Sequence, residues 1–472
     1  MHGAGLNPIP SANTRPLAAN ALQAAFHAKS VAIIGASTDP RKLGHLVLKM
    51  LVESGFEGQV YPVNKSADEV LGHRCYARLT DIEGPVEVAV VIVPSEHLIA
   101  SLNDCAVKEI KLVAAITSGF AEAGEPGRVL QEQLVEALRT APYRLLGPNC
   151  EGYVVPSTKT FVTFSLMTLG LKPGSIAIVA QSGAVSGAIA HRLNRMGVGI
   201  RTLISTGNET DITCTDALEW LAEDEGANTI VCYLEQIRDA DRFVEVARRL
   251  RGRKGIVIEK PGRGRAAAEA VGTHTGAIAG DDKVVDGVFE ELSIVRAPDL
   301  TAAIDAGAAL SLGKTLGGRN VGIISIAGGL AVEASDVFEA GGFEVPRFAD
   351  GLQQEIRKSL PYFAATRNPV DLTGAALSSP GMFKNVIELT LADEGIDAVI
   401  VIITFAKHEE FAHVVMDAAA ATDKPLLVVW TAPESLSPAP LAAFHARSFP
   451  VFDAPIRALT GLKAIARFSG VM

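Results

Sequence analysis

The chain has 472 residues, of which 48% are hydrophobic and 20% charged, and its formal net charge is -10. This length predicts about three domains of ~150 residues, with enough apolar material for a core in each. The acidic balance and the lack of a basic run argue against nucleic acid as a partner. Because no apolar stretch reaches about 18 residues, no membrane-spanning helix is expected. Five scattered cysteines without a CxxC pair argue against a disulfide framework and structural zinc, which predicts a cytoplasmic protein without a metal site of its own.

Short β-branched runs alternate with helical segments after residues 1–21, which lack the apolar core of a signal peptide and are expected to form a flexible tail. Runs that are apolar at nearly every position are typical of strands buried on both faces of a parallel sheet. The first set covers residues 31–34, 60–63, 86–93, 112–117 and 143–146, with helices expected at 44–53 and 129–138. The pattern restarts at 176–180, 200–205, 229–234 and 255–260, and again at 321–326, 398–403, 426–430 and 451–452. This rhythm predicts an α/β protein with doubly wound parallel sheets in three domains, at residues 22–155, 156–312 and 313–472.

Two of these restarts resemble each other. Residues 175–197 match residues 320–342, and each segment is a strand, a turn of small residues and a helix. One interpretation is that βα turns favour glycine in general. The other is a pair of helix N-termini that bind anions, because free backbone N–H groups and the helix dipole favour negative charge there.

The usual nucleotide-binding motifs are absent or incomplete. The first βα turn, Gly35–Gly44, is not GxGxxG, and the GxGxxA match at Gly262–Ala267 lies in mid-chain without a following acidic partner. The GKT at Gly313–Thr315 has Ala308 where a P-loop requires its first glycine. The sequence therefore contains no recognisable ATP site of its own.

Polar and small residues follow four of the predicted strands in the first domain. They are GAST with Lys42 after the first strand, then YPVNK, VPS and AITSGF after the others. Ligands of open α/β sheets bind at these carboxyl ends, and a lysine beside a helix start suits a phosphate-bearing ligand. Each turn taken alone is equally compatible with an ordinary βα connection.

Together with LLGPNCEGYVVP (residues 145–156), these motifs resemble the CoA-binding domain of succinyl-CoA synthetase α subunits and, more closely, of ADP-forming acetyl-CoA synthetases. The resemblance covers nearly the whole chain from about residue 22. It implies a Rossmann-like CoA-binding domain followed by two flavodoxin-like domains. It places CoA against Gly35, Ser37, Thr38, Lys42, Asn64, Lys65, Val93, Pro94, Thr117 and Ser118, and the substrate near Asn149, Cys150 and Gly152. We interpret Cys150 as part of a structural turn, since its Pro and Asn neighbours do not stabilise a thiolate.

The segment GTHTGAIAGDD (residues 272–282) places His274 among small, flexible neighbours. Composition alone favours a surface turn in which Thr273 or Thr275 caps a helix. The HTGAIAG motif, however, is similar to the phosphohistidine loop of ADP-forming acyl-CoA synthetases, which implies that His274 is phosphorylated. An unperturbed imidazole pKa of about 6.5 leaves a ring nitrogen available as a nucleophile near neutral pH.

The same resemblance implies roles for residues that are otherwise unremarkable. Glu235 matches the glutamate that holds the phosphohistidine, although without the family a solvated glutamate at a strand end is the better interpretation. Ser182, Gly183, Gly328 and Gly329 match the two helix starts that bind the phosphoryl group. STGNETD (residues 205–211) resembles a family loop to which we assign no role.

The reaction implied is acid + CoA + ATP ⇌ acyl-CoA + ADP + phosphate, with CoA as a substrate. Because no ATP-grasp domain follows Met472, as it does in fused relatives, we expect ATP or ADP and Mg²⁺ to bind mainly to an ATP-grasp β subunit, in an α2β2-type assembly that takes a carboxylic acid or its acyl-CoA. Two alternatives remain open: a non-catalytic CoA-binding or regulatory protein of the same fold, and a nicotinamide-dependent oxidoreductase. Intact His274 and Glu235 argue against the first, and the missing dinucleotide fingerprint argues against the second.

Overall fold

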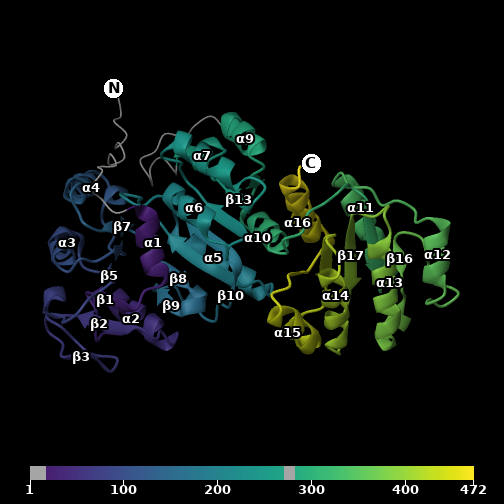
Figure 1. The fold of residues 1–472 in the computed structure, drawn as a ribbon, viewed down its shortest axis with the longest axis horizontal. Coiled ribbons are helices and arrows are strands. Elements are labelled where there is room, and N and C mark those ends of the chain that lie inside the picture. Colours follow the sequence, from purple (N-terminus) through teal and green to yellow (C-terminus); the bar gives the residue numbers. More distant parts are fainter. Residues whose placement is uncertain (1–16, 270–281) are drawn as a thin grey trace. The chain divides into compact units, whose positions relative to one another are not determined.

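The computed structural model describes residues 17–269 and 282–472, and these residues include three large, mainly parallel sheets (Figure 1). They divide into two compact units, which we describe separately. The first unit contains residues up to 191, 200–254 and 258–292, and the second contains 192–199, 255–257 and 293–472. No helix within the described ranges is long and apolar enough to cross a membrane.

The first sheet has the order β2-β1-β5-β6-β7, with every neighbouring pair parallel. Its strands are β1 (Ser30–Ile34), β2 (Gln59–Val63), β5 (Val88–Val91), β6 (Leu112–Ala115) and β7 (Arg144–Leu146), and its helices are α2 (Leu43–Glu53), α3 (Leu98–Val107) and α4 (Glu125–Leu138). A small antiparallel pair, β3 (Glu69–Val70) and β4 (His73–Arg74), follows β2. Strands β1, β5 and β6 are buried at every position, as their uninterrupted apolar runs predict.

The second sheet has the order β14-β13-β12-β10-β11-β8-β9. Its strands are β8 (Tyr153–Val155), β9 (Thr160–Val162), β10 (Pro173–Ala180), β11 (Ile200–Ser205), β12 (Thr229–Tyr233), β13 (Gly255–Glu259) and β14 (Val295–Ala297). The helices between these strands are α5 (Gly183–Arg195), α6 (Cys214–Glu223), α7 (Ala240–Leu250) and α9 (Asp282–Glu291). The neighbours of β10 are parallel to it, whereas β8 and β9 form an antiparallel hairpin that adds to β11. The expected domain boundary at 155/156 falls inside this hairpin.

Helix α1 (Ala18–Phe26) was not predicted, and its first four residues lie in the segment expected to be a tail. Five of its residues are buried, and the helix contacts α6 in the same unit. The Phe26 and Trp220 rings lie 5.5 Å apart, and the Trp220 indole N–H donates to Gln23 Oε1 at 2.9 Å. The helix is therefore ordered by burial of one apolar face, which a short alanine-rich segment reveals poorly in sequence.

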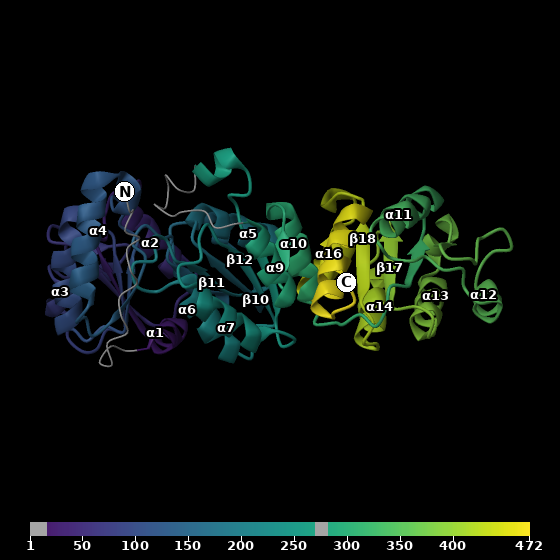
Figure 2. The same cartoon turned by 90° about the horizontal axis from the view of Figure 1, so that it is seen from above.

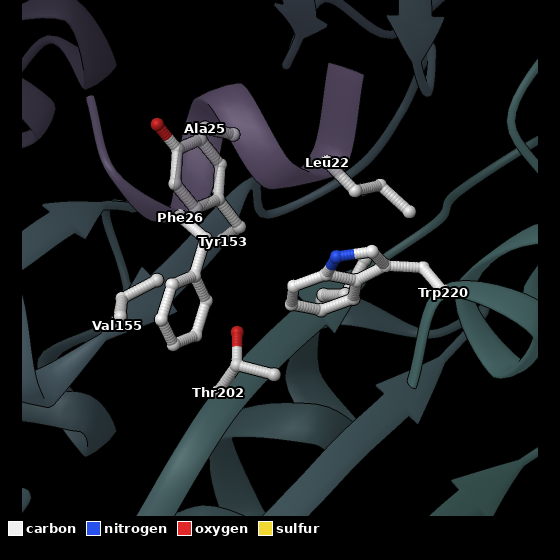
Figure 3. A pocket seen from close by; sticks show the side chains of 8 residues that line it. Leu22, Ala25, Phe26, Tyr153, Val155, Thr202 and Trp220 are labelled. Carbon is white, nitrogen blue, oxygen red and sulfur yellow. The ribbon is translucent and has the colours of Figure 1, made fainter. Parts of the chain in front are cut away.

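A small apolar cavity lies beside α1 and the β8 hairpin. Figure 3 shows the rings of Phe26, Tyr153 and Trp220 around it, with Thr202 on the sheet side. The space measures about 10 Å³, room for one water, and the buried Tyr153 hydroxyl has no hydrogen-bond partner. This cavity is too small for CoA or an acid substrate, so we place the functional site elsewhere.

The second unit contains a parallel sheet of order β16-β15-β17-β18-β19. Its strands are β15 (Val321–Ser325), β16 (Val370–Asp371), β17 (Ala398–Ile403), β18 (Leu426–Trp430) and β19 (Val451–Phe452). Its helices are α10 (Leu300–Leu310), α11 (Gly328–Ala340), α12 (Asp350–Arg357), α13 (Pro380–Ala392), α14 (Glu410–Ala420), α15 (Pro438–Ala446) and α16 (Pro455–Phe468).

Alternate residues of this sheet belong to different cores. Val399, Val401 and Ile403 of β17 pack with Phe383 and Phe411 of helices α13 and α14. Helices α11 and α16 contact each other, and they contact strands β15 and β18, respectively (Figures 1 and 2). The cluster with Phe383 and Phe411 contains no residue of these two helices. Both faces are thus covered, which is the doubly wound arrangement that the apolar runs predict.

Candidate functional site

The carboxyl ends of β1 and β5 form the topological switch point of the first sheet. The chain passes from β1 to β2 on one side and returns to β5 on the other side of β1. A crevice forms where such connections leave in opposite directions, and ligands of open α/β sheets bind there. Residues 35–38 follow β1, and Val93 and Pro94 follow β5 by two and three residues. The structure therefore brings these predicted CoA-binding residues to one edge of the sheet.

Two glycines allow α2 to start directly against the end of β1. Gly35 has φ +93°, and a Cβ there would lie 2.0 Å from the Ile92 carbonyl oxygen. A Cβ at Gly44, the second residue of α2, would lie 2.0 Å from the Gly35 carbonyl oxygen. Lys42 immediately precedes the helix and is exposed. The N-terminus of α2 and a lysine thus share the strand edge, an arrangement that suits a phosphate-bearing ligand.

Three of the predicted CoA-binding side chains build the frame of this edge. The Thr117 hydroxyl donates to the Val93 carbonyl at 2.9 Å, and it accepts the Val93 N–H at 3.2 Å. Asn64 Nδ2 donates to the Ala36 carbonyl at 2.6 Å, and Ser37 Oγ accepts the Asp39 N–H at 3.1 Å. These side chains therefore fix the turns after β1, β2 and β5. Other predicted CoA-binding residues are exposed and do not build this frame. They are Thr38, Lys42, Lys65, Pro94 and Ser118.

Residues 147–152 connect the first sheet with the second. The Cys150 thiol is buried and lies 3.4 Å from the Ala115 carbonyl oxygen, and burial raises its pKa to about 12. Such a thiol stays protonated near neutral pH, as expected for a structural turn and not for a nucleophile. Asn149 Nδ2 donates to Asn208 Oδ1 at 3.2 Å. Gly152 has φ +87° and starts the β8 hairpin, where a Cβ would lie 2.1 Å from the Val162 carbonyl oxygen.

The loop of residues 205–211, to which we assigned no role, joins these connecting residues to the second sheet. Asn208 and Thr210 donate their N–H groups to the Pro148 and Gly147 carbonyls at 2.9 and 3.2 Å. Asp211 forms a buried ion pair with Arg144 of β7, with 2.9 Å between Oδ1 and Nη2. The STGNETD motif therefore connects β7 and the residues that follow it to the second sheet, within the first unit. Neither strand periodicity nor motif spacing predicted these contacts.

The turn between β10 and α5 contains the predicted phosphate-binding residues Ser182 and Gly183. A Cβ at Gly183 would lie 2.2 Å from Glu151 Cγ, so the Glu151 side chain covers the first residue of the helix. Burial raises the pKa of the Glu151 carboxyl, while a hydrogen bond with Ser165 opposes that rise. Sequence reasoning missed Glu151. The available signal was an acidic residue within the otherwise apolar and turn-forming segment 145–156.

Glu235 lies two residues beyond the end of β12, and only 9% of it is exposed. Its backbone N–H donates to Gln181 Oε1 at 2.6 Å, and Gln181 immediately precedes Ser182. The predicted orienting carboxylate is thus tied by its backbone to the segment that starts α5. It is a buried residue, contrary to the interpretation of Glu235 as a solvated glutamate.

The second unit holds the other predicted phosphate-binding turn at the start of α11. A Cβ at Gly328 would lie 2.7 Å from Asp371 Oδ2, whereas a Cβ at Gly329 would meet nothing within 4 Å. Asp371 lies at the end of β16 and accepts the Thr373 N–H at 2.8 Å. Each of the two matching helix starts therefore has an acidic side chain against its first glycine.

His274 lies outside the described residues, so its position relative to Glu235 stays a prediction. Among the residues that the structure does describe, no group of three or more His, Cys, Asp or Glu side chains is arranged to hold a metal ion.

Comparison with known proteins assigns all three parts of the chain. Residues 29–156 match a model described as a CoA binding domain, residues 173–310 match a succinyl-CoA ligase like flavodoxin domain, and residues 321–432 match a ligase-CoA domain. These matches and the three mainly parallel sheets confirm the predicted fold class, a Rossmann-like CoA-binding domain followed by two flavodoxin-like domains.

Similar proteins agree with this assignment over most of the chain. The α subunit of an ADP-forming acetate–CoA ligase I from Pyrococcus furiosus is 37% identical over 361 residues, which are 75% of this chain and 77% of that relative. An ADP-forming acetate–CoA ligase I from Archaeoglobus fulgidus is 30% identical over 94% of this chain and 63% of the relative's length. The dinucleotide forming acetyl-coenzyme A synthetase 1 of Ca. Korarchaeum cryptofilum, solved in complex with phosphate and ADP, superimposes with a TM-score of 0.84 at 30% identity, covering 95% of this chain and 97% of that chain. The chain therefore belongs to the family of ADP-forming acetate–CoA ligases and related nucleoside-diphosphate-forming acyl-CoA synthetases.

Proposed function

We propose that this chain is the CoA-binding, phosphohistidine-carrying subunit of an acid–CoA ligase that catalyses acid + CoA + ATP ⇌ acyl-CoA + ADP + phosphate. The observation that carries the proposal is the hydrogen bond from the Glu235 N–H to Gln181, the residue before the Ser182–Gly183 turn, within the unit that also contains the CoA-type sheet edge. One unit thus supplies both a place for CoA and a buried carboxylate beside a helix start.

CoA binds at the switch point of the first sheet in this proposal. Lys42 and Lys65 are exposed and offer positive charge to its phosphates, while the N-terminus of α2 offers backbone N–H groups. The rigid turns held by Asn64 and Thr117 fix the strand ends against which the ligand lies. The acyl group is assigned to the vicinity of Asn149, Cys150 and Gly152, where the polypeptide leaves this sheet.

Phosphoryl transfer proceeds through His274 in the proposed mechanism. A ring nitrogen of His274 accepts the phosphoryl group of ATP, and ADP leaves. A carboxylate oxygen of the acid then attacks the phosphorus, the N–P bond breaks, and an acyl phosphate forms. The CoA thiolate attacks the acyl carbon, the C–O bond to phosphate breaks, and phosphate leaves. Glu235 orients and stabilises the charged imidazole, and the turns at Ser182, Gly183, Gly328 and Gly329 bind the phosphoryl group through backbone N–H groups.

An ATP-grasp β subunit supplies most of the nucleotide and Mg²⁺ site, in an α2β2-type assembly. Phosphoryl transfer from ATP needs a cationic phosphate cradle with Mg²⁺. The sequence shows no motif for such a cradle, and the Pyrococcus furiosus relative is itself named as an α subunit. Mg²⁺ would neutralise charge on the nucleotide phosphates in that partner.

Labelling with radioactive phosphate tests the proposed function. The chain should acquire an acid-labile label from γ-³²P-ATP, Mg²⁺ and the partner, and also from ³²P-acetyl phosphate without the partner, because the second route runs the acyl phosphate step backwards. Mapping should locate the label at His274. A label that persists in His274→Ala contradicts the mechanism, and a wild-type chain that binds CoA but is never labelled indicates a non-catalytic CoA-binding protein.

A further inference from the structure

The side chain of Gln181 links the end of β10 to the segment that follows β12. Gln181 is 7% exposed, and its Oε1 accepts the N–H groups of Glu235 at 2.6 Å and of Gln236 at 3.0 Å. Its Nε2 donates to the Gln236 carbonyl at 2.8 Å, and its side chain faces the Glu209 carboxyl. The oxygen of this amide accepts twice and its nitrogen donates, so these three hydrogen bonds allow only one orientation of the amide.

These contacts hold Glu235 by its backbone. The Glu235 N–H is taken by Gln181, and its carbonyl accepts from Lys260 Nζ at 3.1 Å. Because the backbone N–H and the backbone carbonyl of Glu235 are both hydrogen-bonded, the surrounding protein sets the direction of its Cα–Cβ bond. Gln181 is directly followed by Ser182 and Gly183, so the same residue sets where Glu235 lies relative to the start of α5.

The carboxyl group that faces the Gln181 amide belongs to Glu209 and is buried. Glu209 is 4% exposed, and its Oε1 accepts the Thr206 hydroxyl at 3.0 Å and the Cys214 N–H at 2.8 Å. Arg238 Nε lies 3.6 Å from its Oε2. Burial raises the pKa of Glu209, although interactions with Cys214, the positive charge of Arg238 and the Gln181 amide act against the rise. Because hydrogen bonds in a buried network reinforce one another, Glu209 fixes the amide that fixes Glu235.

We propose that Gln181, supported by Glu209, is a positioning residue that acts on phosphoryl transfer through Glu235. The proposal rests on the proposed function, since it needs Glu235 to serve a phosphorylated imidazole. It also gives the STGNETD loop a part in the reaction beyond joining two sheets, because Glu209 lies in that loop. Gln181 itself touches neither substrate nor phosphoryl group in this scheme.

Gln181→Leu tests the proposal, because leucine keeps the approximate size but removes the three hydrogen bonds to Glu235 and Gln236. The whole chain is labelled with ³²P-acetyl phosphate, and the rate constant at saturation and the half-saturating concentration are measured. We expect the rate constant to fall by roughly 10- to 100-fold, the usual effect of removing a group that orients another, with the half-saturating concentration within about twofold. Gln131→Leu is the matched control: Gln131 is also buried, and its Oε1 accepts the Ala121 N–H at 3.2 Å and Asn208 Nδ2 at 3.1 Å, so its loss disturbs the 205–211 loop without removing a hydrogen bond to Glu235 or Glu209. It should lose comparable thermal stability and keep the wild-type labelling rate.

A double-mutant cycle separates positioning from general loosening of the fold. Single-turnover labelling can resolve slow residual rates, so Gln181→Leu is also made in the Glu235→Gln background, where it should lower the rate by less than about twofold. An equal fractional loss in both backgrounds overturns the proposal, as does wild-type labelling by Gln181→Leu, a rise confined to the half-saturating concentration, or an equal loss in Gln131→Leu. Absence of label on the wild-type chain contradicts the proposed function and this inference with it. A labelled wild type with an unaffected Gln181→Leu contradicts this inference alone.

Discussion

Replacing Gly44 with alanine tests whether the close approach of α2 to β1 builds the CoA site. The new methyl carbon would lie 2.0 Å from the Gly35 carbonyl oxygen and 3.3 Å from Ala36 Cα, whereas real Cβ contacts are essentially never under 3.0 Å. Because the obstacle is backbone, no side chain can rotate away. The start of α2 or the Gly35 peptide must therefore move by about 1 Å, a displacement that can cost a ligand site a large part of its function.

The expected magnitude follows from two opposing contributions. Overpacking of this kind costs about 1–3 kcal/mol, while alanine in place of glycine within a helix contributes about 0.5–1 kcal/mol of stability. The net loss should be on the order of 1–2 kcal/mol, in folding, in CoA binding, or divided between them. A loss of 1.4 kcal/mol in binding corresponds to about a tenfold weaker affinity.

Calorimetric titration with CoA and thermal unfolding with and without CoA measure both contributions. Gly381→Ala is the matched control, since Gly381 is also the second residue of its helix and a Cβ there meets nothing within 4 Å. The control should bind CoA like the wild type and unfold at the same or a slightly higher temperature. Wild-type CoA affinity together with wild-type thermal stability in Gly44→Ala would refute the reasoning.

Four further outcomes are expected. Glu235→Gln should lower turnover and phosphoenzyme formation by about two to four powers of ten, and unchanged values would show that the carboxylate does not serve the imidazole. Gly329→Val should fold, because its Cβ faces open space, yet block labelling by a phosphoryl donor while CoA binding survives; normal labelling would exclude the α11 start from the site. Burial raises the pKa of the Glu151 carboxyl in the folded state above its value in the unfolded chain. Protonated Glu151 therefore stabilises the folded wild-type chain at low pH, and this stabilisation is lost as the pH rises through the folded-state pKa. The thermal midpoint of Glu151→Gln should therefore increase relative to wild type between about pH 4 and pH 8, and a constant difference contradicts the assignment. Finally, the chain with ATP, Mg²⁺, CoA and a panel of acids should form acyl-CoA only after an ATP-grasp partner is added, and robust turnover without the partner would show that it binds the nucleotide itself.

Much of the candidate site could be predicted because strand ends can be located in the sequence. Gly35 and Pro94 directly follow apolar runs, and the carboxyl ends of parallel strands meet at one sheet edge whatever the loop details. Which of these residues frame the edge and which face outward could not be predicted, because Asn64 and Thr117 donate to backbone carbonyls in the turns that follow the neighbouring strands β1 and β5.

The sequence by itself determined the three successive α/β sets, because strands buried on both faces must be apolar at nearly every position. Runs such as 321–326 and 398–403 therefore stand out as β15 and β17. It also marked the small-residue turns that start α5 and α11, since only such turns let a helix begin directly above a strand end.

Only the tertiary structure decided which side chains meet at those turns. The contacts of Gln181 with Glu235 and Gln236 join positions 54 and 55 residues apart, and Glu151 reaches Gly183 from a different sheet connection. The antiparallel pairing of β8 with β11 and the packing of α1 against α6 are likewise contacts between distant segments. Local periodicity reports which face of an element is buried, whereas the partner that buries it is chosen when the whole chain packs.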